Sequence, residues 1–166
     1  MTADDGDTQA GAANTWVMGS DCSTQACRKH SSFGEKDSTA FKTTGDTFNL
    51  SYGTGSVSGA TVNDTVQIAG GGVPSSFGAA STISEDFLAY LMDGILNLCR
   101  SASNTMQLPT VKETIMGSVK LPANLFGFNL QRNSDGSTDG ELNLVPQTIP
   151  NMVGIYHTAM VSRDKI

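Results

Sequence analysis

Residues 48–59 constrain the fold more than any other stretch, because they have the pattern of a β-hairpin. Apolar or aromatic side chains occupy every second position from Phe48 to Tyr52, which is typical of a strand with one buried face. Gly53 and Gly55 follow and give the backbone the freedom that a tight reversal needs. A return strand is expected directly afterwards, so the chain is expected to build a sheet around this hairpin.

The rest of the chain continues the β pattern. Glycine accounts for 18 of the 166 residues and charged residues for only 16%, which fits short strands with frequent turns better than a helical bundle. The length is enough for one domain with a hydrophobic core. Strands are predicted at residues 47–52, 56–68, 94–98, 125–130, 141–145 and 154–159. The predicted fold class is therefore mostly β.

One short helix is predicted at residues 110–116. Thr110 and Glu113 have the spacing of a capping box, in which each side chain bonds the backbone of the other residue. Gly117 is expected to end the helix. A helical pattern of apolar residues also covers residues 84–91.

Charge and composition exclude several kinds of partner. The net charge is −6 and the sequence has no basic patch, so no nucleic-acid partner is expected. No apolar run reaches the ~18–20 residues of a membrane span, so no membrane partner is expected. His30 and His157 are far apart, and neither a metal site nor a cofactor is predicted.

The first residues differ in character from the rest of the chain. Residues 1–13 are polar and small, with neither helical nor strand periodicity, and they lack the apolar stretch of a signal peptide. We expect them to be a mobile N-terminal segment in front of a domain over residues 14–166.

Short motifs accompany the hairpin in a fixed order along the chain. They are Asn14-Thr15-Trp16-Val17, Cys22 to Cys27 with His30 and Phe33, Asp37-Ser38-Thr39, Asp64-Thr65-Val66-Gln67-Ile68, Asp93-Gly94-Ile95-Leu96, Pro109-Thr110-Val111 and Gly140-Glu141-Leu142. In this order and spacing, the chain resembles the N-terminal lobe of the pepsin-like aspartic proteases over residues 14–158. The resemblance implies one lobe of the pepsin-like acid-protease β-barrel fold. It also implies a loop followed by a strand near residues 84–91.

The resemblance assigns a substrate-binding role to the hairpin. In this family the hairpin is a lid that excludes water and hydrogen-bonds the peptide backbone, so Tyr52, Gly53, Thr54 and Trp16 are expected at the substrate-binding site. Trp16 and Tyr52 are expected to pack together and steady the hairpin. The alternative is that Trp16 and Tyr52 are ordinary core residues and Thr54 a solvent-facing turn residue.

The resemblance also implies a disulfide between Cys22 and Cys27, and with it an oxidising compartment. The alternative is two free thiols. By resemblance, the expected location is secreted, or the lumen of a vacuole or lysosome.

The catalytic motif of the resembled family is not intact in this sequence. Aspartic proteases use two aspartates that share a proton, one as general base for a water and the other as acid. Counted back from Asn14 without gaps, the first aspartate position falls on Gln9, and a neutral amide cannot share a proton. A two-residue insertion would instead place Asp7 there, but it would break the tight turn that aims the carboxylate. Asp7 is therefore the candidate catalytic residue, with Gln9 in the ungapped position.

Two further departures concern the same chemistry. Asn97 and Cys99 stand where the family usually has glycines close to the catalytic loop, and their side chains are expected to crowd that packing. The chain also ends at Ile166, so the second lobe and its catalytic motif are expected to be missing from it.

Three functional hypotheses follow. The leading one is an aspartic-endopeptidase-like single-lobe domain with little or no peptidase activity. The second is a non-catalytic protein that binds a peptide, a protein or a glycan in the remnant cleft. The third is an active homodimeric aspartic protease that uses Asp7. The expected partners are a polypeptide substrate or a protein, together with self-association through an exposed inter-lobe surface.

Overall fold

The computed structural model describes residues 14–68, 71–90, 92–98, 104–118, 125–129, 141–145 and 157–160. The chain divides into two compact units. The first consists of Met1–Thr65 and Pro74–Thr114, and the second of Val66–Val73 and Ile115–Ile166. Asp7, Gln9 and Cys99, on which part of the catalytic interpretation depends, lie outside the described residues.

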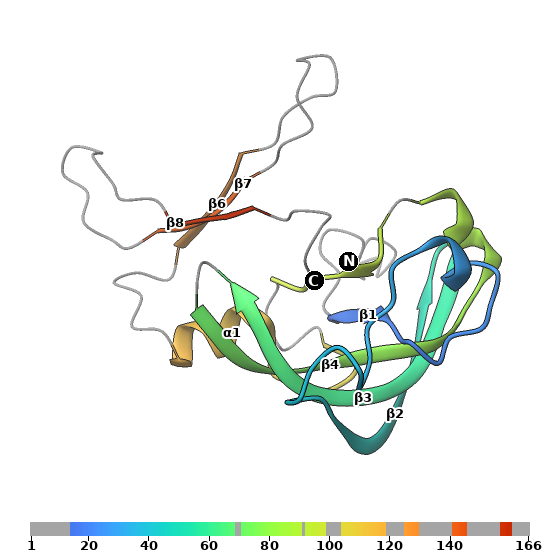
Figure 1. Cartoon of the computed structure of the whole chain (residues 1–166). Helices are drawn as coiled ribbons and strands as arrows, with labels where there is room; N and C mark the ends of the chain where they lie inside the picture. Colours follow the sequence, from blue (N-terminus) through green and yellow to red (C-terminus); the bar gives the residue numbers. More distant parts are fainter. Residues whose placement is uncertain are drawn as a thin grey trace, which may run out of the picture. The chain divides into compact units, whose positions relative to one another are not determined.

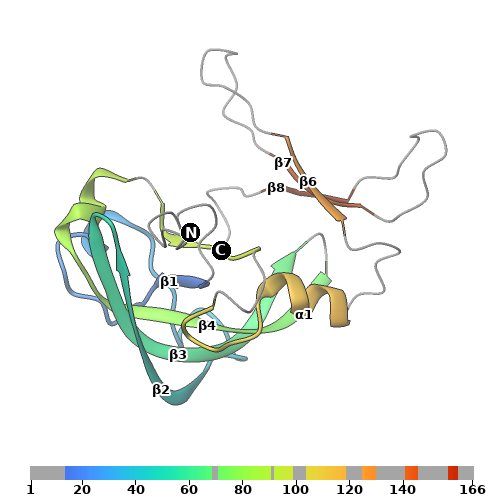
Figure 2. The same ribbon diagram turned by 180° about the vertical axis from the view of Figure 1, so that it is seen from behind.

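The main sheet has five strands in the order β2-β3-β4-β1-β5 (Figure 1). β1 pairs parallel to β4 and antiparallel to β5, whereas β2 and β3 are antiparallel. Both views show β2, β3 and β4 as long, curved strands (Figures 1 and 2). Their bounds are Trp16–Met18 for β1, Lys42–Tyr52 for β2, Gly55–Ile68 for β3, Gly71–Ile83 for β4 and Gly94–Ile95 for β5.

The hairpin predicted from the sequence is formed by β2 and β3. Tyr52 pairs with Gly55, so residues 53–54 alone make the loop. Along the end of β2, Phe48 and Leu50 are buried while the side chains between them and on either side are exposed or half-buried. The prediction of a strand with one buried face is confirmed.

β2 begins at Lys42, earlier than the predicted residue 47. The pairing register with β3 shifts between Thr43 and Thr47. Gly45 lies within this irregularity and has a φ of +88°, a left-handed conformation that glycine adopts at no steric cost. Because the irregularity interrupts the period of two, the pattern in the sequence did not extend the strand beyond it.

Two strands of the main sheet were not predicted. β4 contains Pro74 and a run of small residues, which lack the alternation of large apolar side chains that marks a strand. Small residues are nevertheless needed there, because the ring of Phe48 covers Gly78 so closely that a Cβ would collide with it. β1 has only three residues, too few for a periodic signal.

The core of the first unit lies against the main sheet. Its members come from β1, the disulfide loop, the hairpin, β4 and the turn after β4, so they are far apart in the sequence. They are Trp16, Met18, Ala26, Cys27, Phe48, Leu50, Val57, Ala80, Ile83 and Phe87, all buried. Burial of these apolar side chains is the main stabilising contribution to this unit.

The helix α1 spans Val111–Ser118 and has the predicted capping box. The backbone N–H of Glu113 donates to Thr110 Oγ1, and the backbone N–H of Thr110 donates to Glu113 Oε2, both at 3.2 Å. The helix continues one residue past the predicted end at Gly117, within the usual uncertainty of helix boundaries. No helix in the described part of the chain is long and apolar enough to cross a membrane.

The region between β4 and α1 differs in detail from both sequence interpretations. A 3₁₀ helix, η2, covers Glu85–Ala89, so the helical pattern there corresponds to a short 3₁₀ turn. A strand does follow this turn, but β5 ends at Ile95, short of the predicted residue 98. It ends early because the backbone N–H of Asn97 donates to Thr15 Oγ1 at 3.0 Å instead of continuing a ladder.

The second unit contains a three-stranded antiparallel sheet in the order β6-β7-β8. β6 spans Leu125–Asn129, β7 Glu141–Val145 and β8 His157–Met160. These strands match the predictions at 125–130, 141–145 and 154–159, except that residues 130 and 154–156 lie outside the described residues. Among the described residues the fold is mostly β with one short α-helix, as predicted.

Candidate functional site

The hairpin is fixed to β1 by a hydrogen bond between two of the predicted site residues. Trp16 Nε1 donates to the hydroxyl of Tyr52 at 2.7 Å. Trp16 is fully buried and Tyr52 half-buried. A buried indole N–H needs an acceptor, and the phenol oxygen supplies it. The expected contact between Trp16 and Tyr52 is present, and it connects β1 with the end of β2.

Phe87, on η2, extends this contact into an aromatic cluster. Its ring meets the rings of Trp16 and Tyr52 edge-on, with centroids 5.8 Å away in each case. Tyr90 also packs against Phe87, with ring centroids 5.9 Å apart, and its hydroxyl lies 3.5 Å from Thr54 Oγ1 at the hairpin tip. Edge-to-face contacts of this kind add to the stabilisation from burial alone.

The return strand of the hairpin is bonded to the turn after β4. The backbone N–H of Ser84 donates to the carbonyl of Ser56, and the backbone N–H of Ser56 donates to Ser84 Oγ, both at 3.0 Å. Gly55 lies against Ser84 and Phe87 so closely that a Cβ would collide with their side chains. Close packing therefore favours glycine at this position.

Burial changes the acidity of the Tyr52 phenol. Removal from water raises the pKa of Tyr52 above its ordinary value of 10.0, and the hydrogen bond from Trp16 acts in the opposite direction. The phenol therefore stays protonated at neutral and acidic pH. In that form its O–H is free to donate while its oxygen accepts from Trp16.

The tip of the hairpin is open to solvent. Gly53 and Thr54 are exposed, whereas Tyr52 and Gly55 on either side are half-buried. The aromatic cluster thus holds the stem of the hairpin, whereas Gly53 and Thr54 at its tip are exposed, with the Thr54 hydroxyl beside that of Tyr90. Of the predicted site residues, Trp16, Tyr52 and Thr54 contact this one cluster.

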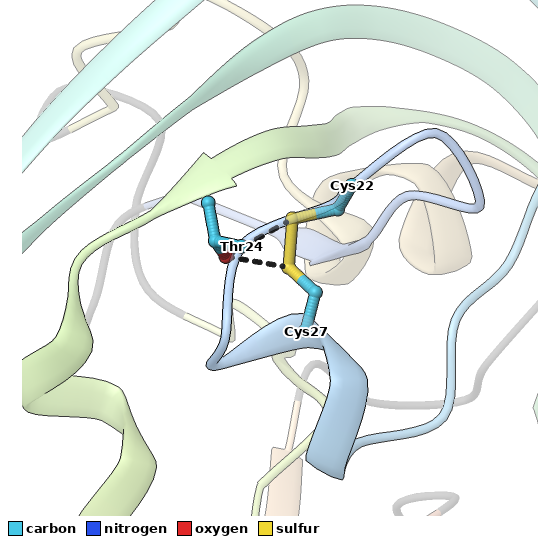
Figure 3. Close-up of a disulfide and its surroundings, with 3 residues drawn as sticks. All are labelled: Cys22, Thr24 and Cys27. Carbon is cyan, nitrogen blue, oxygen red and sulfur yellow. Dashed lines mark hydrogen bonds between the residues drawn. A yellow bond between two sulfur atoms is a disulfide. The ribbon is translucent and has the colours of Figure 1, made fainter.

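The predicted disulfide is present. Cys22 and Cys27 are bonded, with their Cα atoms 5.9 Å apart. Figure 3 shows the Thr24 hydroxyl beside both sulfur atoms, 3.5 Å from Cys22 Sγ and 3.3 Å from Cys27 Sγ. The bond closes the loop in front of the 3₁₀ helix η1, which spans Cys27–Lys29.

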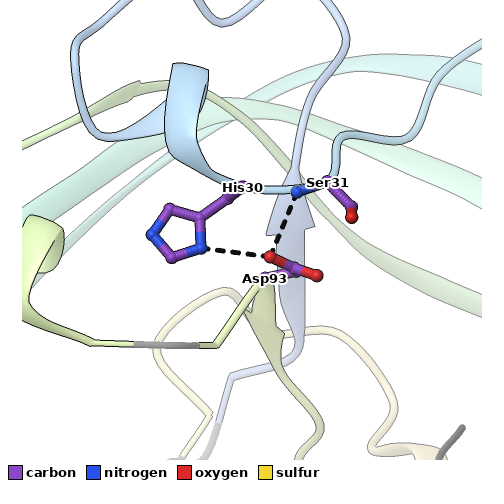
Figure 4. A network of polar contacts seen from close by, with 3 residues as sticks. All are labelled: His30, Ser31 and Asp93. Carbon is purple, nitrogen blue, oxygen red and sulfur yellow. Dashed lines mark hydrogen bonds and ion pairs between the residues drawn. The ribbon is translucent and has the colours of Figure 1, made fainter. Parts of the chain in front are cut away.

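His30, directly after η1, is paired with Asp93 (Figure 4). Its Nδ1 lies 3.1 Å from Asp93 Oδ1, which also accepts from the backbone N–H of Ser31 at 3.1 Å. The His30 side chain is only 5% exposed and that of Asp93 33%. The backbone carbonyl of Asp93 accepts from the N–H of Met18 at 3.0 Å. Asp93 therefore joins the segment after η1 to β1.

A buried carboxylate connects two of the motifs seen in the sequence. Asp64 on β3 accepts from Ser38 Oγ at 2.8 Å and from the backbone N–H of Thr65 at 2.6 Å, both through Oδ1. Its exposed fraction is 6%. The motifs at residues 37–39 and 64–68 thus support each other structurally.

The start of the described chain contacts two segments that lie far along the sequence, near residues 97 and 105. Asn14 Oδ1 accepts from Thr105 Oγ1 at 3.2 Å and from the backbone N–H of Met106 at 3.1 Å. Asn97, bonded to Thr15, is 1% exposed. The buried Asn97 side chain is therefore accommodated within the fold, beside Thr15.

Sequence reasoning missed the contributions of Phe87, Ser84 and Tyr90. The signal was present, because Phe87 and Leu88 belong to the apolar pattern at residues 84–91. That pattern showed burial but not which neighbours the side chains meet. Within the described parts of the chain, no three His, Cys, Asp or Glu side chains come together as metal ligands would.

The sequence is similar to those of aspartic endopeptidases. A family model described as eukaryotic aspartyl protease matches residues 7–160. Over 132 residues the chain is 46% identical to the probable aspartic-type endopeptidase CTSD of Arthroderma otae, which covers 80% of this chain and 35% of that protein.

Other relatives are similar in the same way. Over 133 residues the chain is 44% identical to the aspartic-type endopeptidase ctsD of Aspergillus fumigatus, covering 80% of this chain and 28% of that protein. Over 155 residues it is 31% identical to pepsin A of Bos taurus, covering 84% of this chain and 41% of that protein. The chain therefore spans less than half the length of each of these three relatives.

Proposed function

Because this chain belongs to the eukaryotic aspartyl protease family, we propose that it is a pepsin-like lobe whose hairpin covers a peptide-binding cleft and that the chain alone has little or no peptidase activity. The proposal of a peptide-binding cleft is supported by the hydrogen bond from Trp16 to Tyr52, which holds the hairpin in place while its tip stays exposed. A fixed hairpin with an exposed tip offers backbone groups to a ligand beneath it. An extended peptide is the ligand whose own backbone groups can pair with them.

The second part of the proposal rests on the sequence around Gln9. Proton sharing between two carboxylates lets one act as base and the other as acid. With Gln9 in the ungapped position, this chain would contribute an amide instead of a carboxylate to that pair. The binding part of the site would persist without the catalytic part.

An acid-pH peptidase assay tests the loss of activity. The purified 166-residue chain is incubated with a fluorogenic peptide, with and without pepstatin. We expect no cleavage that pepstatin inhibits. The variant Gln9→Asp is assayed in parallel, because it restores a carboxylate at the ungapped position.

Pepstatin-sensitive cleavage by the unmodified chain would contradict the proposal. Asp7→Asn then identifies the source of that activity, because a homodimeric protease built on Asp7 would lose it completely. A matched control is Asp21→Asn, a change in an exposed residue next to the disulfide loop, which should alter nothing.

A non-catalytic binding protein is the second candidate, favoured by the intact hairpin stem. Binding of pepstatin, measured by calorimetry at acidic pH, tests the cleft directly. Thr54→Ala removes a hydroxyl at the tip and should weaken binding, while Thr47→Ala, an exposed change elsewhere on β2, should leave it unchanged. If both variants bind as the original chain does, the hairpin tip is not the site.

We also propose a lumenal location, either outside the cell or in a vacuole or lysosome. The disulfide between Cys22 and Cys27 supports it, because such bonds persist mainly in oxidising compartments. Mass spectrometry of alkylated protein from its natural source would test this location. Free thiols at both positions would contradict it.

A further inference from the structure

We propose that Asn49 on β2 carries an N-linked glycan. The inference rests on the proposed lumenal location, because proteins sent there first pass through the compartment in which the transferase for this modification acts. Asn49, Leu50 and Ser51 form the acceptor pattern Asn-x-Ser with no proline between. Sequence alone cannot say whether the folded protein has room for a glycan, and the structure answers that question.

The side chains of Asn49 and Ser51 lie on the outer face of the hairpin. Both are exposed, whereas Leu50 between them is buried at 5% exposure. The strand thus directs both residues of the acceptor pattern to solvent and keeps the apolar one in the core. The Asn49 amide makes no side-chain hydrogen bond within the described part of the chain, so a bond to a sugar would break no existing interaction.

The surroundings of Asn49 leave space for a sugar. Ser58 pairs with Asn49 across the hairpin, Ala60 pairs with Thr47 and Ser56 with Ser51. All of these neighbours are small and uncharged. Asn49 also lines a shallow hollow with Thr105 and Gln107, both exposed, so the volume beside its amide is open.

β2 is also a place where a glycan has a physical effect. It lies at the end of the described sheet and pairs only with β3 there. An edge strand presents unpaired backbone groups that invite pairing with another chain. A bulky, hydrated sugar on Asn49 would hinder such edge-to-edge association.

A second acceptor pattern, Asn63-Asp64-Thr65, provides a comparison within the same chain. Asn63 lies on β3, between β2 and β4, and its Oδ1 accepts from Ser76 Oγ at 2.6 Å. Asn63 is exposed as well, but unlike Asn49 its amide oxygen is already bonded to a neighbouring side chain. The inference concerns Asn49 alone.

The transfer itself needs a co-reactant of a definite class, an oligosaccharide linked to a lipid through a diphosphate. The Asn49 amide nitrogen attacks the anomeric carbon of the first sugar and forms a C–N bond. The C–O bond to the diphosphate breaks, the nitrogen loses one proton and the lipid diphosphate leaves. The membrane-bound transferase of the host compartment catalyses this step.

The test uses the full chain behind a cleavable secretion signal in a eukaryotic host. Peptides of the secreted protein are analysed by mass spectrometry before and after an amidase removes N-glycans, which converts a glycosylated asparagine to aspartate. We expect the peptide with Asn49 to carry one glycan core. Asn49→Gln and Ser51→Ala should each abolish that glycan, and Ser51→Thr should retain it.

Asn63→Gln is the matched control, in which the glycan on Asn49 should be unchanged. An unmodified Asn49 in secreted protein with an oxidised Cys22–Cys27 pair would overturn the inference, and so would a glycan found only on Asn63. Neither result bears on the proposed function, which the peptidase and pepstatin measurements decide separately.

Discussion

At the scale of single residues, Trp16 decides how the hairpin is held. It is the only tryptophan of the chain and is fully buried, so its N–H must find an acceptor inside the protein. Tyr52 provides that acceptor, and the ring of Phe87 packs edge-on against both rings. The same tryptophan is a convenient probe, because its fluorescence reports directly on the site.

Tyr52→Phe is expected to lower the free energy of unfolding by about 1–3 kcal/mol, because it leaves the buried indole N–H without its acceptor. Urea unfolding followed by Trp16 fluorescence measures this. Tyr90→Phe is the matched control. It removes a hydroxyl from an exposed ring and should change stability by less than about 0.5 kcal/mol. Equal losses in the two variants would contradict the assigned role of Tyr52.

The raised pKa of Tyr52 predicts a loss of stability at alkaline pH. The folded state holds the phenol proton more tightly than the unfolded state does, so this contribution is fully present below about pH 10. It is lost as the pH rises through the pKa of the folded state. Above pH 10 the original chain should therefore lose free energy of unfolding more steeply than Tyr52→Phe. Parallel pH profiles for the two proteins would be inconsistent with the buried phenol.

The pair of His30 and Asp93 is expected to show energetic coupling. A double-mutant cycle with His30→Gln and Asp93→Ala, measured by urea unfolding, should give an interaction free energy of about 1 kcal/mol. The value is modest because Asp93 is one-third exposed and solvent screens the pair. Additive losses in the two single variants would show that the contact contributes nothing.

At the scale of elements, the sequence predicted those features that depend on interactions between residues close together in the chain. The hairpin and the capping box of α1 depend on neighbours in the chain, and both were predicted. β4 was missed because its strand state depends on pairing with other strands and not on its own small side chains. The apolar pattern at residues 84–91 favours an α-helix, whereas the structure has the 3₁₀ helix η2 there. Burial of Phe87 gives the same pattern in either case.

Thr110→Ala should destabilise α1, because it removes the side-chain oxygen that accepts from the N–H of Glu113. A loss of about 1 kcal/mol is expected. Hydrogen exchange of the Glu113 amide measures it locally, and exchange should become faster. Thr110→Ser keeps the acceptor and should leave the exchange rate near its original value. Unchanged protection in Thr110→Ala would mean that the cap is not used.

At the scale of the whole molecule, long-range pairing organises the first unit. β1 pairs with β4 and β5, which lie far along the chain, and Asp93 joins the segment after η1 to β1. Such contacts are entropically costly to bring together. A covalent link that restricts the unfolded chain therefore helps the whole unit.

Replacement of both disulfide cysteines, Cys22→Ser with Cys27→Ser, should cost about 2 kcal/mol on the chain-entropy account of a short loop. The double variant is used because a single one would leave a free thiol. The midpoint of urea unfolding should fall, while the Trp16 emission of the folded state should stay the same. A midpoint equal to that of the original chain would show that the loop is constrained by its packing alone.

The sequence by itself determined the mostly β character, the hairpin, the capped helix and the family, because these depend on local spacing and on motifs in order. Only the tertiary structure decided which distant residues meet. It packed Phe87 against both Trp16 and Tyr52, paired His30 with Asp93 and directed Asn49 to solvent. The physical reason is that periodicity fixes which face of an element is buried, whereas contacts between elements depend on how the whole chain packs.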